Sequence, residues 1–516
     1  MTSVPLQTPG FFPVGAYEHP KTPTHADSHV DYDTGSSILG AALLYRMNGP
    51  IASNNEGWIT SAGPSEDLSY SWPQDHNLLA IYPQSPMRQP TRAGRSFDST
   101  STPSTRPINH DLCNFIRILC HSVPPSVNVA RMMREDHFAH VTNDYLVQRI
   151  SGWFMAPPPV IGDSLLAQVK GSKRMTWTMY LGAKLFQALG QNPQTHGSAV
   201  QGYIGWIDKL EQKFTIDYRY NPPLKDTTDC FMVQLELTNL NFSVVDNFSG
   251  YALLQRALPR FLRLVAANSA LFMEYSHGNL VVSFHRTLSA PRYEIQRFVM
   301  YDMVAAFMFG ISPLVEYGYD GECDPGSHKL EWVHGIPVVL FEAVSQVNSW
   351  RASSRVPLDN WQTLERHVLA WELPYSIPEE TSDIVDPSVA RGAVQEGWRH
   401  VVLIYIYMGI CGVSSHDPRV QASVHQIVQL GEIVADLPIC VQMFAHCIVA
   451  GLGARLERHR VFVHKMLPSF KNTRVWLFQG PQFIDVLYRL WHGVGAGGAP
   501  VSWDDYVQAR RAVIPI

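Results

Sequence analysis

The chain has 516 residues, of which 46% are hydrophobic and 16% are charged. A chain of this length and composition can bury one large core or two ordinary ones, so an entirely disordered protein is excluded. The formal net charge is −5. Proteins that grip nucleic-acid phosphates over a broad surface are usually clearly basic, so the overall charge leaves only local basic patches to consider for that role.

The first 107 residues differ in composition from the rest of the chain. They contain 13 of the 36 prolines, a single lysine, Lys21, and many Ser, Thr, Asn and Gly residues. Such a segment buries too little apolar surface to offset its conformational entropy, so we predict a disordered Pro/Ser/Thr-rich leader over residues 1–107. Within it, Ser36–Met47 is an apolar island that favours either a short docking helix or no stable structure. The leader also suits phosphorylation or weak coactivator contact, and the chain begins without the pattern of a secretory signal.

Residues 108–516 show helical spacing of their apolar side chains. Two examples are Trp361, Leu364, Val368 and Trp371, and Phe483, Val486, Leu487, Leu490 and Trp491. Ser502 is a suitable N-cap for a last helix, because Asp505 can return the hydrogen bond and Val501 and Tyr506 can form a hydrophobic staple. The spacing predicts an all-α fold, a multi-helix stacked bundle, after the leader.

Three apolar runs are long enough to be compared with membrane-spanning helices. Val401–Val413 is shorter than the about 20 residues that a bilayer requires. Phe298–Val315 contains Asp302, and Leu437–Leu456 contains a histidine and an arginine. We interpret all three as buried helices of a soluble domain and expect no membrane partner.

One segment has a different period. Apolar and mostly polar residues alternate from Phe231 to Thr238, and the alternation continues through Leu240, Phe242 and Val244. A period of two predicts a β-strand on the local pattern alone. The family resemblance described below implies a helix here, and we follow the resemblance.

Seven cysteines are scattered along the chain, and none forms a C-x2-C pair. Cys113 and Cys120, like Cys440 and Cys447, are seven residues apart. On a helix this spacing separates them by about 10 Å, which is too far for a disulfide or for one zinc ion. We interpret the cysteines as reduced thiols of an intracellular protein.

Motifs for phosphate binding and hydrolysis are weak or missing. The sequence has no Gly-Lys dipeptide and no G-x-S-x-G motif, so it contains neither a P-loop nor a nucleophile elbow. Gly493–Gly498 fits G-x-G-x-x-G, but it follows a predicted helix that ends near Trp491, and Pro500 separates it from the next helix. Without a preceding strand, this motif predicts an interhelical loop.

Two kinds of polar cluster remain as candidate sites. His137, His140 and Asp144 would share one face of a helix, where they could bind a metal ion or form a solvated polar face. Lys170–Arg174 and Arg455–Arg460 are the densest basic patches. Either patch suits a contact with nucleic acid or with an import receptor, and solvated helix ends are the alternative.

Several stretches resemble one protein family by their order and spacing. They are Glu294–Asp302 continuing to Phe309–Tyr317, Gly335–Leu340 through Asn348–Trp350 to Leu358–Glu365, Trp398–Val413 with His416–Val420, and Phe444–Arg460 with Val486–Trp491 and Trp503. Together, from about Ile108 to the C-terminus, they resemble the fungal-specific transcription factor domain. This is the regulatory domain of Zn2Cys6 zinc-cluster transcription factors.

The resemblance implies an α-helical regulatory and interaction module, residence in the nucleus, and control of transcription by the polymerase II machinery. It brings no catalytic residues, so we assign no catalytic, cofactor-binding or metal-binding residue. The zinc cluster of the family needs six cysteines in two C-x2-C-x6-C-like halves, and this sequence has no match to it. A zinc cofactor is therefore expected only if a cluster is encoded upstream of Met1.

We therefore expect a leader over residues 1–107 and a regulatory domain over residues 108–516 of a transcription regulator that is not an enzyme. It would be either a truncated member or one without a DNA-binding domain. Its expected partners are proteins of the transcription machinery and a second subunit in a homo- or heterodimer. DNA would be bound only through a missing zinc cluster or a partner. The alternatives are a helical metabolite-binding protein or enzyme on the same scaffold, and a cytoplasmic helical adaptor.

Overall fold

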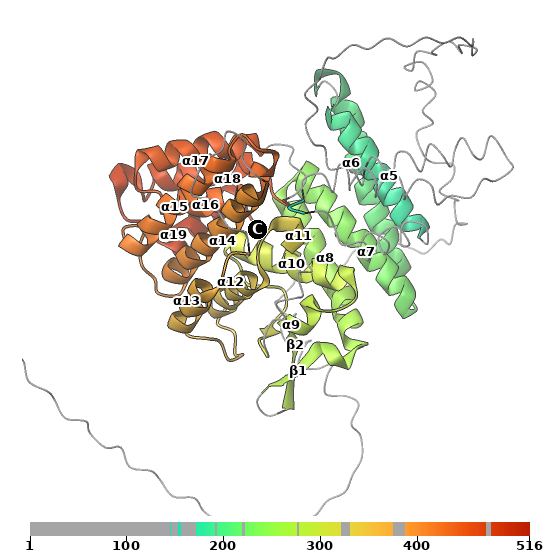
Figure 1. Cartoon of the computed structure of the whole chain (residues 1–516). Coiled ribbons are helices and arrows are strands. Elements are labelled where there is room, and N and C mark those ends of the chain that lie inside the picture. The colour runs from blue at the N-terminus through green and yellow to red at the C-terminus, as the bar shows by residue number, and fades with distance from the viewer. Residues whose placement is uncertain are drawn as a thin grey trace, which may run out of the picture. The chain divides into compact units, whose positions relative to one another are not determined.

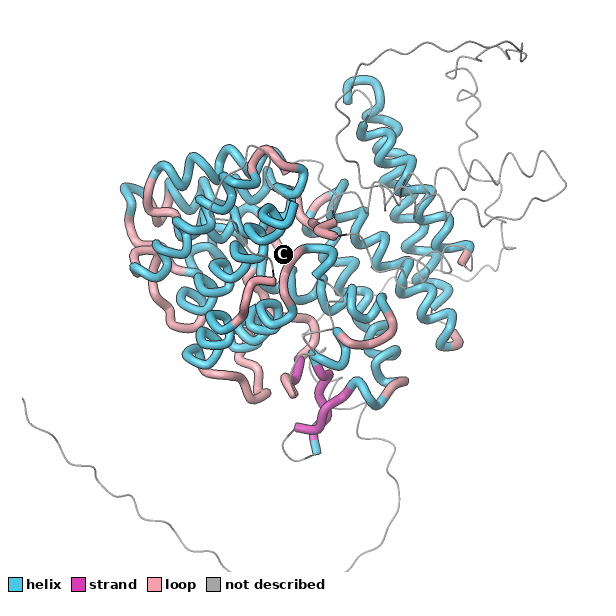
Figure 2. Tube along the Cα trace, in the orientation of Figure 1, coloured by secondary structure: helices cyan, strands magenta, loops and turns pink. Residues whose placement is uncertain are grey.

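The structure is a computed structural model, and it describes Tyr145 and residues 153–155, 172–190, 193–218, 222–275, 278–320, 331–374, 387–470 and 476–516. The predicted leader and its boundary with the helical domain lie outside these residues. Across the described chain the all-α prediction is confirmed, because helices dominate and a single small sheet accompanies them (Figures 1 and 2).

Figure 1 labels the helices that the structure describes. They are α5 (Lys173–Gly190), α6 (Pro193–Tyr218), α7 (Leu224–Leu240), α8 (Asn247–Ala266), α9 (Phe284–Leu288), α10 (Tyr293–Phe309), α11 (Glu331–His334), α12 (Val338–Arg351), α13 (Trp361–Ala370), α14 (Pro387–Gly409), α15 (Pro418–Val434), α16 (Phe444–Gly453), α17 (Glu457–Ser469), α18 (Gly480–His492) and α19 (Trp503–Val513). A π-helical turn, Asn241–Val245, extends α7. From α14 to α19 each helix packs against the next one in sequence, which gives this half its stacked arrangement.

The segment whose local pattern predicted a strand forms α7, as the resemblance implied. Phe231 and Leu235 belong to the larger hydrophobic cluster of the chain, whereas Val233, Leu237 and Leu240 belong to a second cluster with α5 and α6. The helix is therefore buried on two sides. Two apolar stripes at helical spacing, offset by two residues, produce the alternation that resembles a strand in the sequence.

A small sheet interrupts the helices, and the sequence patterns did not predict it. β1 (Phe272–Tyr275) pairs antiparallel with β2 (Asn279–Ser283), and β2 pairs parallel with β3 (Tyr317–Gly318). Strands this short display too few residues for a period of two to be recognised. A Cβ atom on Gly318 would lie 2.1 Å from the Met273 sulfur, so glycine allows β1 and β3 to approach.

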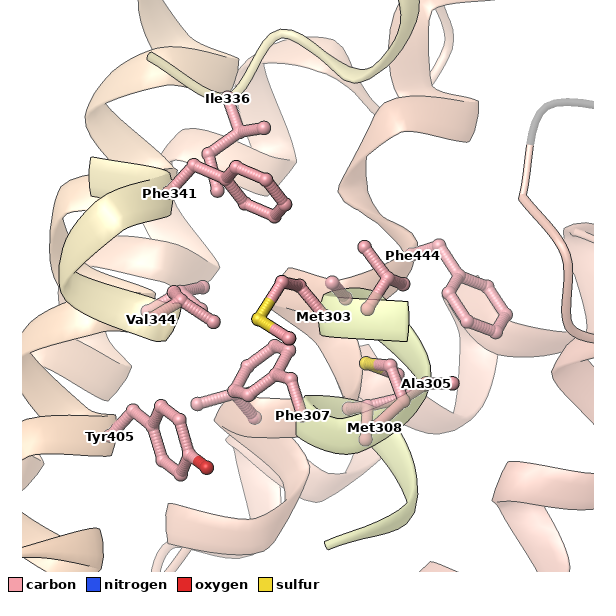
Figure 3. Packing of buried hydrophobic residues seen from close by; sticks show 14 of the residues in the cluster. Met303, Ala305, Phe307, Met308, Ile336, Phe341, Val344, Tyr405 and Phe444 are labelled. Atoms are coloured by element: carbon pink, nitrogen blue, oxygen red, sulfur yellow. The ribbon is translucent and has the colours of Figure 1, made fainter. Parts of the chain in front are cut away.

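The helix α10 lies at the centre of the larger cluster. Every residue from Glu294 to Phe309 is buried. Figure 3 shows side chains of α10 packed among residues of α12 and α14, and the rings of Phe307 and Tyr405 lie 4.8 Å apart. Burial of so many large side chains provides most of the favourable free energy of folding in this region.

The apolar face predicted between residues 483 and 491 is confirmed, and the one predicted between residues 361 and 371 is confirmed except for its last position. All five stripe residues between 483 and 491 are buried in α18. In α13, Leu364 and Val368 are buried and Trp361 is half-buried, but the helix ends at Ala370, so Trp371 lies just beyond it. The fourth position of that stripe belongs to the connection that follows the helix.

The predicted N-cap of the last helix is confirmed. The amide of Asp505 donates to the Ser502 hydroxyl at 3.2 Å, and the amide of Ser502 donates to the Asp505 carboxylate at 2.8 Å. Val501 and Tyr506, the two staple positions, are both buried. These reciprocal bonds set the first residue of α19.

Two glycines with left-handed backbones provide a matched test of packing against α10. Gly310 ends α10 with φ 61°, and a Cβ atom there would lie 2.3 Å from Cγ2 of Val507 in α19. Gly412 has φ 65° and no atom within 4 Å of its added Cβ. We expect Gly310→Ala to lower the free energy of unfolding by about 3 kcal/mol and Gly412→Ala by about 1 kcal/mol. Chemical denaturation followed by circular dichroism measures both.

The extra cost of Gly310→Ala should shrink in a Val507→Ala background, because the contact that causes it is gone. Equal costs at the two glycines would contradict the close packing of α10 and α19.

Candidate functional site

A buried ion pair joins α7 to α10. Nη2 of Arg297 lies 2.7 Å from Oε2 of Glu236, and both side chains are buried. Glu236 also accepts a hydrogen bond from the Tyr145 hydroxyl, and Nε of Arg297 donates to Tyr301 at 2.7 Å. Burial lowers the pKa of Arg297, but the charge of Glu236 and the bond to Tyr301 raise it well above its ordinary value, so the guanidinium stays charged. The pair is neutralised internally, which assigns it to holding the helices together.

Asp302 forms hydrogen bonds to the segment that follows α10. Its Oδ1 accepts from the Leu314 amide at 2.7 Å, and its Oδ2 accepts from the Val315 amide at 3.3 Å and from the Tyr317 hydroxyl at 3.2 Å. Burial raises the pKa of Asp302 to about 7, although these three hydrogen bonds act in the opposite direction. The carboxyl group therefore positions β3, which begins at Tyr317.

Backbone carbonyls of α10 accept further hydrogen bonds from other helices. The Asn348 amide of α12 donates to the Met303 carbonyl at 3.0 Å and accepts from the Tyr405 hydroxyl of α14 at 2.7 Å. The Tyr506 hydroxyl of α19 donates to the Met308 carbonyl at 2.6 Å. Two helices, α12 and α19, are thus held directly to α10 by hydrogen bonds as well as by apolar packing, and α14 is joined to α12 through Asn348.

One cluster contains the residue types of a hydrolytic site. Nε2 of His285 lies 3.0 Å from Oε2 of Glu342, and its Nδ1 lies 2.9 Å from the Asp320 carbonyl. Burial lowers the pKa of His285, but Glu342 and Asp320 together raise it by more, so the net pKa is raised. The Ser283 hydroxyl donates to Asp320 at 2.6 Å and accepts from the Arg286 amide. Since Ser283 is fully buried and caps α9, the cluster ties β2 and α9 to α12 instead of presenting a nucleophile.

The candidate metal ligands named from the sequence are not part of the described chain. His137, His140 and Asp144 all lie outside the described residues, so the choice between a metal site and a solvated polar face stays untested. Within the described ranges, no three His, Cys, Asp or Glu side chains converge to hold a metal ion.

The Gly493–Gly498 segment is an interhelical loop, as predicted. The Gly495 carbonyl accepts from Nη2 of Arg460 at 3.3 Å, and the Gly498 carbonyl lies 2.8 Å from Nε2 of His416. Gly497 and Gly498 have φ values of 66° and 81°, which explains the choice of glycine. The loop is therefore fixed to α17 and to the start of α15.

The three apolar runs belong to the packed domain, and their α-helical parts are residues 401–409 in α14, 298–309 in α10 and 444–453 in α16. None of the helices that the structure describes combines the length and the hydrophobicity that crossing a membrane requires. His446, which interrupts one run, is fully buried; burial lowers its pKa to about 3, so the ring is neutral. Within the described ranges, Cys411, Cys440 and Cys447 are free thiols.

The two predicted basic patches have different outcomes. In Lys170–Arg174, Arg174 forms an ion pair with Asp229 at 3.0 Å, and Lys170 lies outside the described residues. In the second patch, Arg455 and Arg458 are exposed, as a solvated helix end predicts. Its remaining members are occupied by the fold, because His459 is buried and Nε of Arg460 donates to the Ala454 carbonyl at 3.1 Å.

Exposed cations and exposed apolar side chains meet where α17 and α18 lie side by side (Figure 1). We call this the α17–α18 surface and define it by Arg455, Leu456, Arg458, Val461, Lys465, Tyr488, Arg489 and Val494. The helices run antiparallel, because Arg460 near the start of α17 bonds to Gly495 after α18, and Gly480 at the start of α18 adjoins Leu467 near the end of α17. Leu456 and Val494 therefore lie at the same end of the surface.

Tyr488 joins the two helices at the centre of this surface. Its ring centroid lies 5.4 Å from that of His464 in α17 and 5.8 Å from that of His492 in α18. Sequence patterning identified Arg455 and Arg458 but missed Tyr488 and Val461. In the sequence, Tyr488 and Val461 differ from buried residues only in lying off the apolar face of each helix. That position does not distinguish a binding residue from an ordinary exposed one.

Comparisons with known proteins agree with the family resemblance. Residues 277–514 match the family model of the fungal specific transcription factor domain. No curated protein and no solved structure matches the chain. The matched range extends from the β1–β2 turn to the end of α19, so it includes the α10 centre and the α17–α18 surface. The match supports a general role in the regulation of transcription.

The raised pKa of Asp302 predicts a pH-dependent stability. In the folded protein this carboxyl group keeps its proton up to about pH 7, whereas in the unfolded chain it loses the proton near its ordinary pKa of 3.8. Its contribution is therefore fully present below the unfolded pKa and is lost as the pH rises through the folded pKa. We expect the unfolding free energy of the wild type, relative to Asp302→Asn, to fall between pH 4 and pH 7.

Urea denaturation of both proteins across this pH range measures the difference. Asp417→Asn is the control with the opposite sign, because the hydrogen bond from Arg419 lowers the pKa of Asp417. A flat wild-type-minus-Asp302→Asn difference would contradict the raised pKa.

The Glu236–Arg297 pair predicts strong coupling between two substitutions. Glu236→Gln and Arg297→Met should each lower the free energy of unfolding by about 3 kcal/mol, since each leaves a buried group without its partner. The double variant should cost at least about 1 kcal/mol less than the sum of the single variants. Additive costs in denaturant titrations would show that the two side chains do not interact.

Proposed function

Residues 277–514 belong to the fungal specific transcription factor domain family, and we propose that this protein is a transcription regulator of the fungal zinc-cluster type. In this proposal the helical domain acts as the regulatory and interaction module. The family match is the observation that carries the proposal.

We propose that the domain acts by binding other proteins and not by catalysis. In the described part of the matched range, two buried titratable groups hold elements together: Asp302 binds backbone amides and His285 pairs with Glu342. The α17–α18 surface, by contrast, leaves exposed side chains of mixed character available. Mixed apolar and cationic surfaces are typical of partner-binding sites.

The proposed partners are proteins of the transcription machinery, with a homo- or heterodimer as a further assembly. DNA would be reached through a partner or through a zinc cluster outside this sequence, since the sequence itself contains no C-x2-C pair. The proposed place of action is the nucleus, where such partners are found.

A tethering experiment tests the regulatory role. The full chain is fused to a heterologous DNA-binding domain and expressed in a fungal host with a reporter gene under the matching operator. We expect a several-fold change in reporter output relative to the DNA-binding domain alone, and nuclear fluorescence of the unfused, tagged chain.

Two variants serve as controls. Arg297→Met removes one member of the buried pair and should abolish the change, because the domain is destabilised. Arg366→Glu alters an exposed residue of α13 and should preserve it. The regulatory role is refuted if the folded, nuclear fusion leaves reporter output at the baseline.

A further inference from the structure

The α17–α18 surface differs in charge from the chain as a whole. It has four exposed cations, Arg455, Arg458, Lys465 and Arg489, in a protein whose net charge is −5. The same two helices expose only two carboxylates, Glu457 and Asp485. Within the described residues none of the four cations forms an ion pair. A local positive potential therefore remains available to an anionic partner.

Apolar groups lie among these cations. Val461 is 58% exposed, Val494 55%, Leu456 43% and Tyr488 37%. These are four of the twelve large hydrophobic side chains that are exposed in the described chain, and they lie in two adjoining helices or within two residues of their ends. Exposed apolar residues that gather in one place, rimmed by charge, are typical of a protein-binding surface.

Burial of neighbouring residues gives the surface a rigid base. Arg460 binds the Gly495 carbonyl and its guanidinium lies 5.6 Å from the Trp491 ring centre, which fixes one end of α17 to the loop after α18. His459, on the inner side of α17, is buried; burial, Arg458 and His425 lower its pKa, so the ring is neutral. The charge of the surface thus comes from the exposed arginines and the lysine, on helices already held in place.

We propose that the α17–α18 surface binds an acidic, amphipathic segment of a partner protein, in which carboxylates alternate with apolar side chains. The carboxylates would pair with Arg458, Lys465 and Arg489, and the apolar side chains would cover Val461 and Tyr488. This inference rests on the proposed function in one respect, namely that the domain acts by binding partners.

Charge and apolar content together favour a peptide over DNA. Phosphate backbones gain from the cations alone and leave the exposed apolar groups uncovered. An acidic amphipathic segment gains from both kinds of side chain, since it pairs with the cations and removes apolar surface from water. Tyr and Arg, both present on this surface, are also residue types that most often dominate binding energy.

Fluorescence anisotropy with the full chain tests the proposal. The probe is a labelled synthetic peptide of about 15 residues in which Asp and Glu alternate with Leu and Phe. Replacing its acids by Asn and Gln, or its Leu and Phe by Ala, should each weaken binding by about tenfold or more. Binding of the acidic peptide should also weaken as salt is raised.

Variants of the surface locate the binding. Arg458→Glu with Lys465→Glu should weaken peptide binding by about tenfold or more, as should Val461→Ser with Tyr488→Ala. The matched control, Arg366→Glu with Arg511→Glu, makes the same change in net charge at exposed positions of α13 and α19. Its affinity should stay within about twofold of the wild type. Thermal unfolding by circular dichroism verifies that each variant is folded.

Two results would overturn the inference. One is equal peptide affinity in the wild type and in both folded surface variants. The other is tighter binding of a DNA duplex of about 20 base pairs that is lost in the charge variant, which would assign the surface to nucleic acid. The tethered reporter separates these failures from that of the proposed function: regulation that persists without peptide binding overturns only the inference about this surface.

Discussion

Burial of α10 on every side obliges its charged and polar groups to find partners inside the protein. Arg297 is neutralised by Glu236 of α7, and Asp302 is met by two backbone amides and the Tyr317 hydroxyl. Each partner comes from a different part of the chain, so satisfying one helix fixes the positions of several others. An unpaired charge at either position would cost several times the free energy of an ordinary hydrogen bond.

The same constraint explains how the small sheet is placed. The chain leaving α10 turns at Gly310 and binds Asp302, and it then pairs with β2 as β3. Beyond β3, the Tyr319 hydroxyl lies 2.7 Å from the Ser345 hydroxyl of α12. The small sheet is therefore held against the helices by hydrogen bonds to side chains of α10 and α12. This arrangement engages Asp302 and Arg297 in structure, whereas cationic and apolar side chains of α17 and α18 stay exposed.

Much of the helical architecture was predictable because its signals are local. The stripe in α18 and the Ser502–Asp505 cap need only neighbours within a few residues, and both were confirmed. The alternation around Phe231 shows where local signals fail. A helix packed on two sides distributes its apolar residues over two faces, and the resulting pattern equals that of a strand. The candidate surface was predicted only in part, because Arg455 and Arg458 were visible as a basic cluster while the exposure of Tyr488 and Val461 was not.

The sequence by itself determined the helical class, the capping of α19, the interhelical nature of the Gly493–Gly498 loop and the family resemblance later matched over residues 277–514. Periodicity, caps and glycine content are properties of short stretches, and they persist whatever the neighbours are. Only the tertiary structure decided that α7 separates two cores, that Glu236 pairs with Arg297, and that α17 packs against α18 with cations and apolar side chains exposed on both. These features join residues distant in sequence, and no local pattern records which distant residue will supply the partner or leave a side chain exposed.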